Sequence, residues 1–151
     1  IVLSQRPSEV FHIYGSAMGA NIRALEGDNV TAHGFAEDLA DVYDRHRVFI
    51  APLRSGAGIK GKVLGALARG VPCVLSPVAA EGTGLRSGYD CLIAEDPSMW
   101  AEHIVSLLTQ DELWLKLSTN GRDFVKESFS VQRGQQIMRK AFQAADIYFT
   151  L

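Results

Sequence analysis

Short apolar segments rich in β-branched residues alternate with longer amphipathic segments along most of the chain. The apolar segments predict strands at 10–14, 30–33, 47–51, 73–76 and 90–94. Apolar residues at helical spacing predict helices at 17–25, 37–43, from near Gly58 to Gly70, and then at 96–109, 111–126 and 130–149. This alternation predicts an α/β fold with a doubly wound, Rossmann-like parallel sheet, followed by C-terminal helices.

The segment from Ala51 to Pro72 predicts one strand–loop–helix–strand unit of that sheet. Pro52 ends the strand at 47–51, and the helix after the loop ends at Gly70. The inward face of this helix is predicted from the residues at helical spacing, which are Ile59, Val63, Ala66, Leu67 and Gly70. The start of the helix is therefore expected at the carboxyl end of the preceding strand.

The loop before this helix has the composition of a phosphate-binding loop. Gly56 and Gly58 would let a ligand approach the backbone closely, because glycine has no Cβ. The first N–H groups of a helix lack intrahelical partners and lie at the positive end of its dipole, so they favour an anion. Three cationic side chains surround the turn: Arg54, Lys60 and Lys62.

Two phosphate motifs overlap in this loop, and both are incomplete. Gly56 to Gly61 matches the dinucleotide fingerprint G-x-G-x-x-G, but residues 52–55 separate it from the strand. The P-loop pattern is also present, except that Val63 replaces the Ser or Thr that holds magnesium. The alternative is a loop that merely connects the strand to the helix.

The composition is that of one ordinary soluble domain, with 151 residues of which 47% are hydrophobic and 21% charged. A formal net charge of −2 argues against nucleic acid or an anionic membrane surface as the main partner. No apolar run reaches the length of a transmembrane segment, and we expect no signal peptide. Cys73 and Cys91 lack metal-binding spacing, which predicts buried thiols, no metal site and a reducing cytoplasm.

Ligands of parallel sheets bind beyond the carboxyl ends of the strands. Candidate binding residues at those ends are Gly15, His33, Gly34, Phe35, Arg54, Gly56, Ala57, Gly58, Ile59, Lys60 and Glu81. Arg54 and Lys60 are suited to diphosphate oxygens, and the 33–35 segment to a base. The alternative for Arg54 and Lys60 is a solvated charge on the loop. The alternative for His33 is a histidine whose ring bonds to nearby backbone. We expect Lys62 to be solvated, and the sequence identifies no partner for His12, His46 or His103.

These segments together resemble the C-terminal, donor-binding domain of GT-B fold glycosyltransferases, the family called glycosyl transferases group 1. The resemblance covers roughly residues 10–130 and is carried by the segments 13–15, 30–34, 48–53, 58–60, 66–72 and 80–82, with further similarity at Trp100 and at 129–130. It implies a nucleotide-diphosphate sugar as donor substrate and retention of anomeric configuration. It also implies no bound metal or cofactor. Glu81 would accept hydrogen bonds from hydroxyls of the donor sugar.

The same resemblance implies that residues 1–151 are a single nucleotide-sugar-binding domain and a fragment of a longer enzyme. The first strand and the N-terminal acceptor domain of the family would lie upstream of Ile1. The acceptor, which could be a glycan, a lipid or a small molecule, stays open, and no catalytic residue is assigned. We therefore expect the fragment alone to be inactive. The full-length protein is expected in the cytoplasm, either free there or at the inner membrane surface.

The sequence departs from the family where two acidic residues are often found, at Ala57 and Gly65. An acid at the second position would bind the donor ribose, so Gly65→Glu is expected to tighten nucleotide binding. The same change should raise stability, because Glu is a better helix former than Gly. Two alternatives stay open: a nucleotide-sugar epimerase of the same fold, and a non-catalytic nucleotide-sugar-binding module.

Overall fold

The computed structural model describes residues 1–145, and the paired strands in that range run parallel within each sheet. They are β1 Phe11–Tyr14, β2 Val30–Gly34, β3 Phe49–Ala51, β4 Cys73–Leu75 and β5 Leu92–Ile93. Each lies within a segment that the sequence predicted as a strand, except that β2 extends one residue further. The predicted parallel α/β architecture is therefore confirmed.

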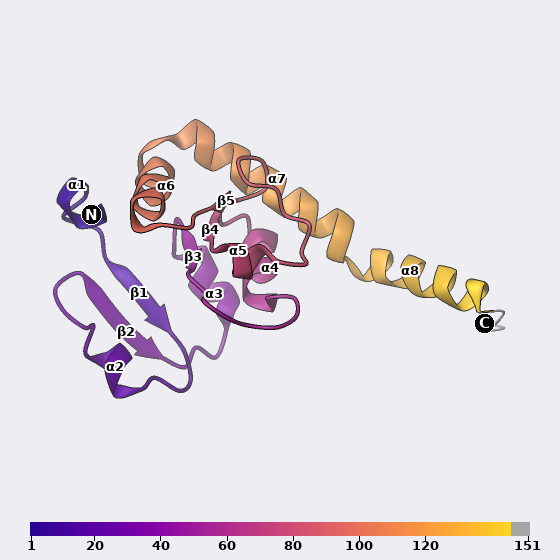
Figure 1. The fold of residues 1–151 in the computed structure, drawn as a ribbon, viewed down its shortest axis with the longest axis horizontal. Coiled ribbons are helices and arrows are strands. Elements are labelled where there is room, and N and C mark those ends of the chain that lie inside the picture. Colours follow the sequence, from indigo (N-terminus) through magenta and orange to yellow (C-terminus); the bar gives the residue numbers. More distant parts are fainter. Residues whose placement is uncertain (146–151) are drawn as a thin grey trace.

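The strands of residues 1–145 are divided between two sheets. β1 pairs with β2, and β3, β4 and β5 form a second sheet in that order, with β4 in the centre. Figure 1 shows β1 and β2, with the short helix α2 (Ala20–Arg23), as a lobe beside the rest of the molecule.

The remaining helices are α1 Val2–Gln5, α3 Leu39–Asp44, α4 Gly61–Ala68, α5 Pro77–Ala80, α6 Pro97–Thr109, α7 Asp111–Phe129 and α8 Val131–Ala144. Capping side chains explain where several of them begin. Asp96 accepts hydrogen bonds from the N–H groups of Ser98 and Met99, and Ser130 accepts one from Arg133. α5 lies in a segment for which the sequence analysis predicted neither a helix nor a strand. The end of the last predicted helix and the apolar patch expected at 147–151 lie outside the described residues.

The β3–β4–β5 sheet is covered on both faces, because successive side chains of a strand point to opposite sides. Phe49 and Ala51 of β3 pack with α4 and with the later part of α7. Ile50 packs on the other face with α6 and with Leu117 of α7. Each face has its own hydrophobic cluster, and we call them the α4 face and the α6 face.

Both thiols of the chain are free and fully buried in this sheet. Cys73 begins β4, and Cys91 directly precedes β5 in the register that pairs Val74 with Leu92. Burial raises the pKa of the Cys91 thiol to about 12 and raises that of Cys73 well above its ordinary value. The prediction of buried thiols is confirmed.

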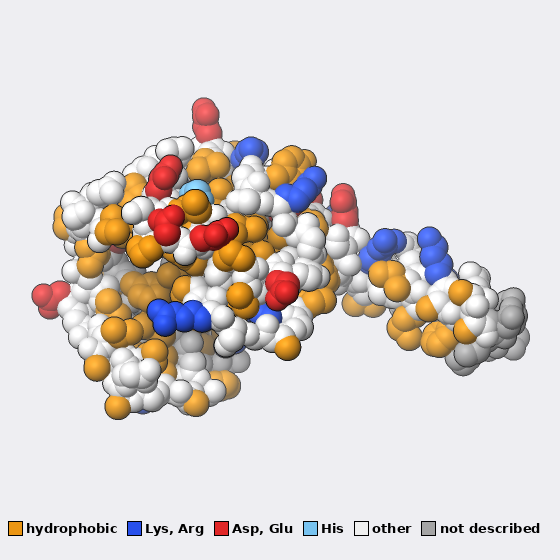
Figure 2. Space-filling view, viewed as in Figure 1, with side chains coloured by type: hydrophobic (Ala, Val, Ile, Leu, Met, Phe, Trp, Pro, Cys, Tyr) orange, Lys and Arg blue, Asp and Glu red, His pale blue; other side chains and the backbone are white. Residues whose placement is uncertain are grey.

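Figures 1 and 2 show α8 extending away from the other elements. Val131, Ile137 and Met138 are exposed on it. None of the helices in the described part of the chain is both long enough and apolar enough to cross a bilayer.

Candidate functional site

The loop between β3 and α4 turns at two glycines that adopt left-handed backbone conformations. The φ angle is 151° at Gly56 and 72° at Gly58, which side chains with a Cβ rarely adopt. These glycines leave the backbone of the loop exposed, so a ligand could approach it directly. The close backbone approach expected from the sequence is therefore available.

Lys60 folds back over this loop. Its Nζ donates hydrogen bonds to the carbonyl oxygens of Gly58 at 2.7 Å and of Gly56 at 3.0 Å. The side chain thus places its charge at the centre of the turn, directly before the start of α4. A ligand phosphate could compete for that ammonium group, because a charge-assisted hydrogen bond is stronger than one to a neutral carbonyl.

α4 begins at Gly61, three residues later than the sequence predicted. Ile59 therefore lies outside the helix and is 54% exposed, so its predicted place on the core face was wrong. The physical reason is that residues 56–60 are used to turn the chain. Val63, Ala66 and Leu67 are buried as predicted. The N–H groups of Gly61 and Lys62 are the first of the helix and have no intrahelical acceptor.

The other predicted site residues lie at the ends of strands but do not converge. The N–H of Gly15 donates to the carbonyl of Gly34 at 2.7 Å, which joins the ends of β1 and β2. Phe35, Arg54 and Glu81 have exposed side chains. Within residues 1–145 no hydrogen bond or ion pair links Gly15, His33, Gly34 or Phe35 to the glycine loop or to Glu81.

A cluster of rings on β1 and β2 was missed by the sequence analysis. His12 Nδ1 lies 2.8 Å from His33 Nε2, and the His33 ring stacks on Tyr14 at 4.5 Å. His46, which precedes β3, contacts both His12 and Tyr14 edge-on. Burial lowers the pKa of His12, and the neighbouring His46 and His33 lower it further.

The strand alternation could have revealed part of this cluster, because His12 and Tyr14 share one face of β1. The contact with His46 depends on how β3 lies beside β1, which the local pattern does not give.

In the part of the chain that the structure describes, no group of three or more His, Cys, Asp or Glu side chains is arranged to hold a metal ion.

Tyr43 of α3 occupies the space beside Gly65. Its hydroxyl donates to the carbonyl of Lys62 at 3.0 Å, and its side chain is buried. A Cβ at Gly65 would lie 3.1 Å from both the ring and the hydroxyl of Tyr43. Gly65 therefore packs against a neighbouring helix, and this contact argues against the rise in stability that the sequence analysis expected for Gly65→Glu.

Gly65→Glu is accordingly expected to lower the free energy of unfolding by up to about 2 kcal/mol. Overpacking costs roughly 1–3 kcal/mol, and the better helix propensity of Glu offsets up to about 1 kcal/mol of that. Urea denaturation of the variant measures the change. Gly61→Glu is the matched control, because a Cβ there meets no atom within 4 Å. A Gly65→Glu variant more stable than the unmodified protein would contradict the packing explanation.

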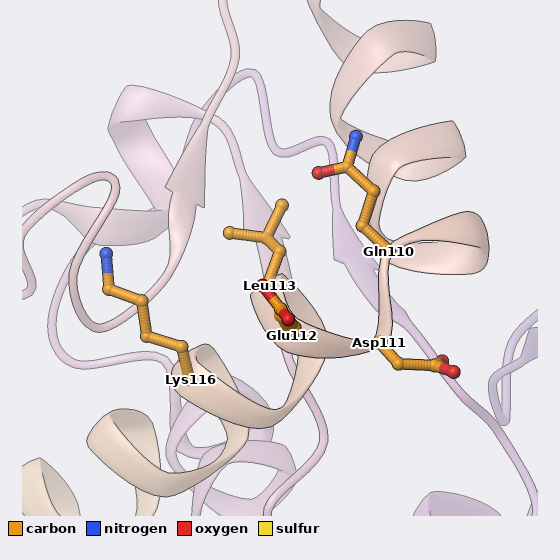
Figure 3. A pocket seen from close by; sticks show the side chains of 5 residues that line it. All are labelled: Gln110, Asp111, Glu112, Leu113 and Lys116. Carbon is orange, nitrogen blue, oxygen red and sulfur yellow. The ribbon is translucent and has the colours of Figure 1, made fainter.

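A hollow of about 440 Å³ lies at the junction of α6 and α7, away from the residues predicted to bind phosphate. Figure 3 shows the side chains that line it, which are Gln110, Asp111, Glu112, Leu113 and Lys116. The carboxylate of Asp111 points away from Leu113 and Lys116 and pairs instead with Arg47. These side chains do not converge on a ligand, so the glycine loop remains the candidate site.

Comparison with known proteins gives a match over most of the chain. The family model described as "Glycosyl transferases group 1" matches residues 2–110, which include the glycine loop and Glu81. An uncharacterized 44.6 kDa protein from the cps region of Klebsiella pneumoniae is 30% identical over 97 residues. That match covers 64% of this chain and 25% of the relative.

Two solved structures show the same fold at low sequence identity. The C-terminal domain of LpcC, a glycosyl transferase group 1 family protein from Francisella tularensis, is 17% identical with a TM-score of 0.73. The match covers 87% of this chain and 75% of that domain. Alr3699/HepE from Anabaena, solved with UDP and glucose, is 16% identical with a TM-score of 0.78, over 93% of this chain and 42% of HepE.

Proposed function

The chain belongs to the glycosyl transferases group 1 family, and we propose on that premise that it is the nucleotide-sugar-binding domain of a glycosyltransferase. The expected fold class, the C-terminal half of a GT-B fold, is confirmed by the likeness to LpcC and HepE. The chain spans a quarter of its curated relative, so transfer of a sugar is proposed for the longer protein of which this domain is part.

The observation that carries the proposal is the glycine loop before α4. It combines an exposed backbone at Gly56 and Gly58, the first N–H groups of a helix, and the ammonium group of Lys60. Together these are donors suited to the oxygens of a diphosphate. HepE was solved with UDP and glucose, and the pneumococcal O-GlcNAc transferase GtfA with UDP and GlcNAc, which supports a nucleotide-diphosphate sugar as the donor.

In the proposed reaction the bond between the anomeric carbon of the sugar and the diphosphate oxygen breaks, a bond to the oxygen of an acceptor hydroxyl forms, and the proton of that hydroxyl passes to the leaving diphosphate. Negative charge develops on the leaving diphosphate. The start of α4 and Lys60 would stabilise that charge without a bound metal, because donors that are already oriented need little rearrangement. Retention of the anomeric configuration is part of the proposal and rests on the resemblance to the family. The acceptor would be held by an N-terminal domain of the same protein.

Glu81 is proposed to bind hydroxyls of the donor sugar, and His33 to Phe35 to lie beside the base. Glu81 ends α5 with an exposed side chain, so its carboxylate is free to accept hydrogen bonds. Phe35 is 71% exposed, which leaves an apolar ring available for stacking on a base. Arg54 is an additional cation next to the loop.

Titration of the longer protein with UDP, GDP and ADP is expected to perturb the backbone amides of Gly56 to Lys60 more than any other segment, as followed by NMR.

Lys60→Ala should weaken binding of whichever of these nucleotides binds by about 10–150-fold, which corresponds to the roughly 1.5–3 kcal/mol of a charged hydrogen bond. Lys116→Ala is the control, since Lys116 bonds to the carbonyl of Gly88 instead. Perturbations concentrated outside the loop would refute the assignment of the site.

Turnover distinguishes the two alternative functions from sugar transfer. A nucleotide-sugar epimerase converts the donor without any acceptor, and a binding module binds the donor but converts nothing. The departure from the family at Gly65 is the observation that keeps the binding module open, because no carboxylate stands at that position. An assay of the longer protein with labelled UDP-sugar, with and without acceptors, separates all three.

A further inference from the structure

Tyr43 of α3 bridges the strand and the helix that flank the glycine loop. Its ring contacts Phe49 of β3 edge-on, with 5.9 Å between the ring centres. Its hydroxyl donates to the carbonyl of Lys62, the second residue of α4, at 3.0 Å. Because the loop runs from the end of β3 to the start of α4, one side chain contacts the elements on both sides of the loop.

The glycine at position 65 gives this hydroxyl its access to α4. Lys62 and Gly65 lie three residues apart, so they share one face of the helix. A Cβ at Gly65 would lie 3.1 Å from the Tyr43 hydroxyl, which is tighter than most Cβ contacts in proteins. Any larger residue there would push the hydroxyl away from the carbonyl of Lys62. The two residues therefore act together, and we call them the Tyr43–Gly65 pair.

The first and last turns of α4 are held by separate contacts with α3, which lies beside it in Figure 1. The Tyr43–Gly65 pair acts on the first turn. At the end of the helix, Asp44 of α3 accepts a hydrogen bond from Arg69 Nε at 2.9 Å and forms an ion pair with the same guanidinium group. Both charged side chains are about half exposed, so water and salt weaken that ion pair. One end of the contact can therefore be altered without the other.

Tyr43 is buried, so any effect that it has on a ligand at the loop passes through α4. Only 7% of the residue is exposed. Burial raises the pKa of its hydroxyl, and the nearby Cys73 adds to the rise, so the group stays a neutral donor. The carbonyl that it bonds belongs to Lys62, which together with Gly61 carries the first N–H groups of the helix.

We propose that Tyr43, in the space that Gly65 leaves, is a positioning residue of the glycine-loop site and holds the first turn of α4 in the arrangement that binds a nucleoside diphosphate. This inference rests on the proposed function. Without the hydroxyl bond, the first turn of α4 populates other arrangements. The apparent affinity then falls in proportion to the fraction of molecules that keep the binding arrangement. Loss of one neutral hydrogen bond limits that effect to about tenfold.

Tyr43→Phe in the full-length protein tests the proposal, because it removes the hydroxyl and keeps the ring. Calorimetry uses UDP, GDP or ADP, whichever binds the unmodified protein most tightly. The dissociation constant of the variant is expected to be about 3–10-fold higher. Asp44→Asn is the matched control, since it weakens the contact between α3 and the last turn of α4, and its affinity should stay within about twofold. Equal losses in the two variants, or a loss below about twofold for Tyr43→Phe, would overturn the proposal.

Gly65→Ala tests the part assigned to the glycine, since the new Cβ should displace the hydroxyl while Tyr43 itself is unchanged. It is expected to weaken nucleotide binding in the unmodified background. In the Tyr43→Phe background it should change affinity by less than about twofold, because no hydroxyl bond remains to be lost. Alanine is used because the carboxylate of a glutamate could itself contact the nucleotide. Equal effects in the two backgrounds would overturn the role of Gly65.

NMR of the amides of Gly61 and Lys62 separates positioning from a general loss of stability. In Tyr43→Phe without nucleotide, these signals should move while those of the last turn of α4 stay in place. At saturating nucleotide they should approach their positions in the unmodified complex, because the nucleotide selects the same arrangement. Signals that stay displaced at saturation would overturn the proposal.

The same measurements distinguish the two possible failures. If the unmodified protein binds none of the three nucleotides, the proposed function fails and the inference fails with it. If the unmodified protein binds one of them and Tyr43→Phe binds it equally well, only the inference fails.

Discussion

Leu67→Ala is expected to lower the free energy of unfolding by about 2–5 kcal/mol, the usual cost of removing a large side chain from a packed core. Leu67 lies on the buried face of α4 with 1% of its side chain exposed. It packs among residues of α3, β3, β4 and α7 in the cluster of the α4 face. The expected loss of free energy has two sources: apolar area that is no longer buried, and the cavity that the shortened side chain leaves.

Urea denaturation of the variant measures this loss. Leu115→Ala is the matched control, because Leu115 lies on α7 with 62% of its side chain exposed and should change stability by less than about 0.5 kcal/mol. Equal effects from the two substitutions would show that the α4 face is not a stabilising core.

Gly121→Ala is expected to destabilise the protein by about 1–3 kcal/mol, although alanine is the better helix former. A Cβ at Gly121 would lie 2.7 Å from Leu67 Cδ2 and 3.0 Å from the backbone carbonyl of Asp90. α7 must therefore move away from α4 and from the turn before β5 to make room. Thermal or urea unfolding gives the size of the change.

Gly134→Ala is the same substitution at a site where no atom lies within 4 Å of the added Cβ. It should stabilise α8 locally by up to about 1 kcal/mol. In the double variant Leu67→Ala with Gly121→Ala, the cost should be smaller than the sum of the single costs, since the shortened side chain leaves room for the new methyl group. Additive costs would mean that most of the cost of Gly121→Ala comes from the contact between the new Cβ and the backbone carbonyl of Asp90.

The sequence predicted those parts of the fold that depend on local pattern. Strand positions followed from runs of β-branched residues, and Asp96 and Ser130 marked the starts of α6 and α8 because caps act within one turn. Leu67 was placed correctly because its helix is amphipathic. The turn before α4 could be predicted because Gly56 and Gly58 follow the end of a strand, and its use as a phosphate site stays a prediction.

Features that depend on distant contacts were not predictable in this way. Ile59 fits the helical pattern, but the chain needs residues 56–60 for the turn, so the helix begins later. Gly65 looks solvent-facing on a helical wheel, and only the packing of α3 brings Tyr43 against it. The ring cluster of His12 and His46 likewise needs two segments that are far apart in sequence.

The two buried thiols allow opening of the fold to be measured by chemical labelling of the unmodified chain. Cys73 begins β4 and Cys91 directly precedes β5, both with no exposed surface, and burial keeps both as unreactive thiols rather than thiolates. An alkylating reagent can therefore reach them only when the β3–β4–β5 sheet opens. Mass spectrometry after a pulse of reagent would count opened molecules directly in a cell lysate, without purification and without an introduced probe.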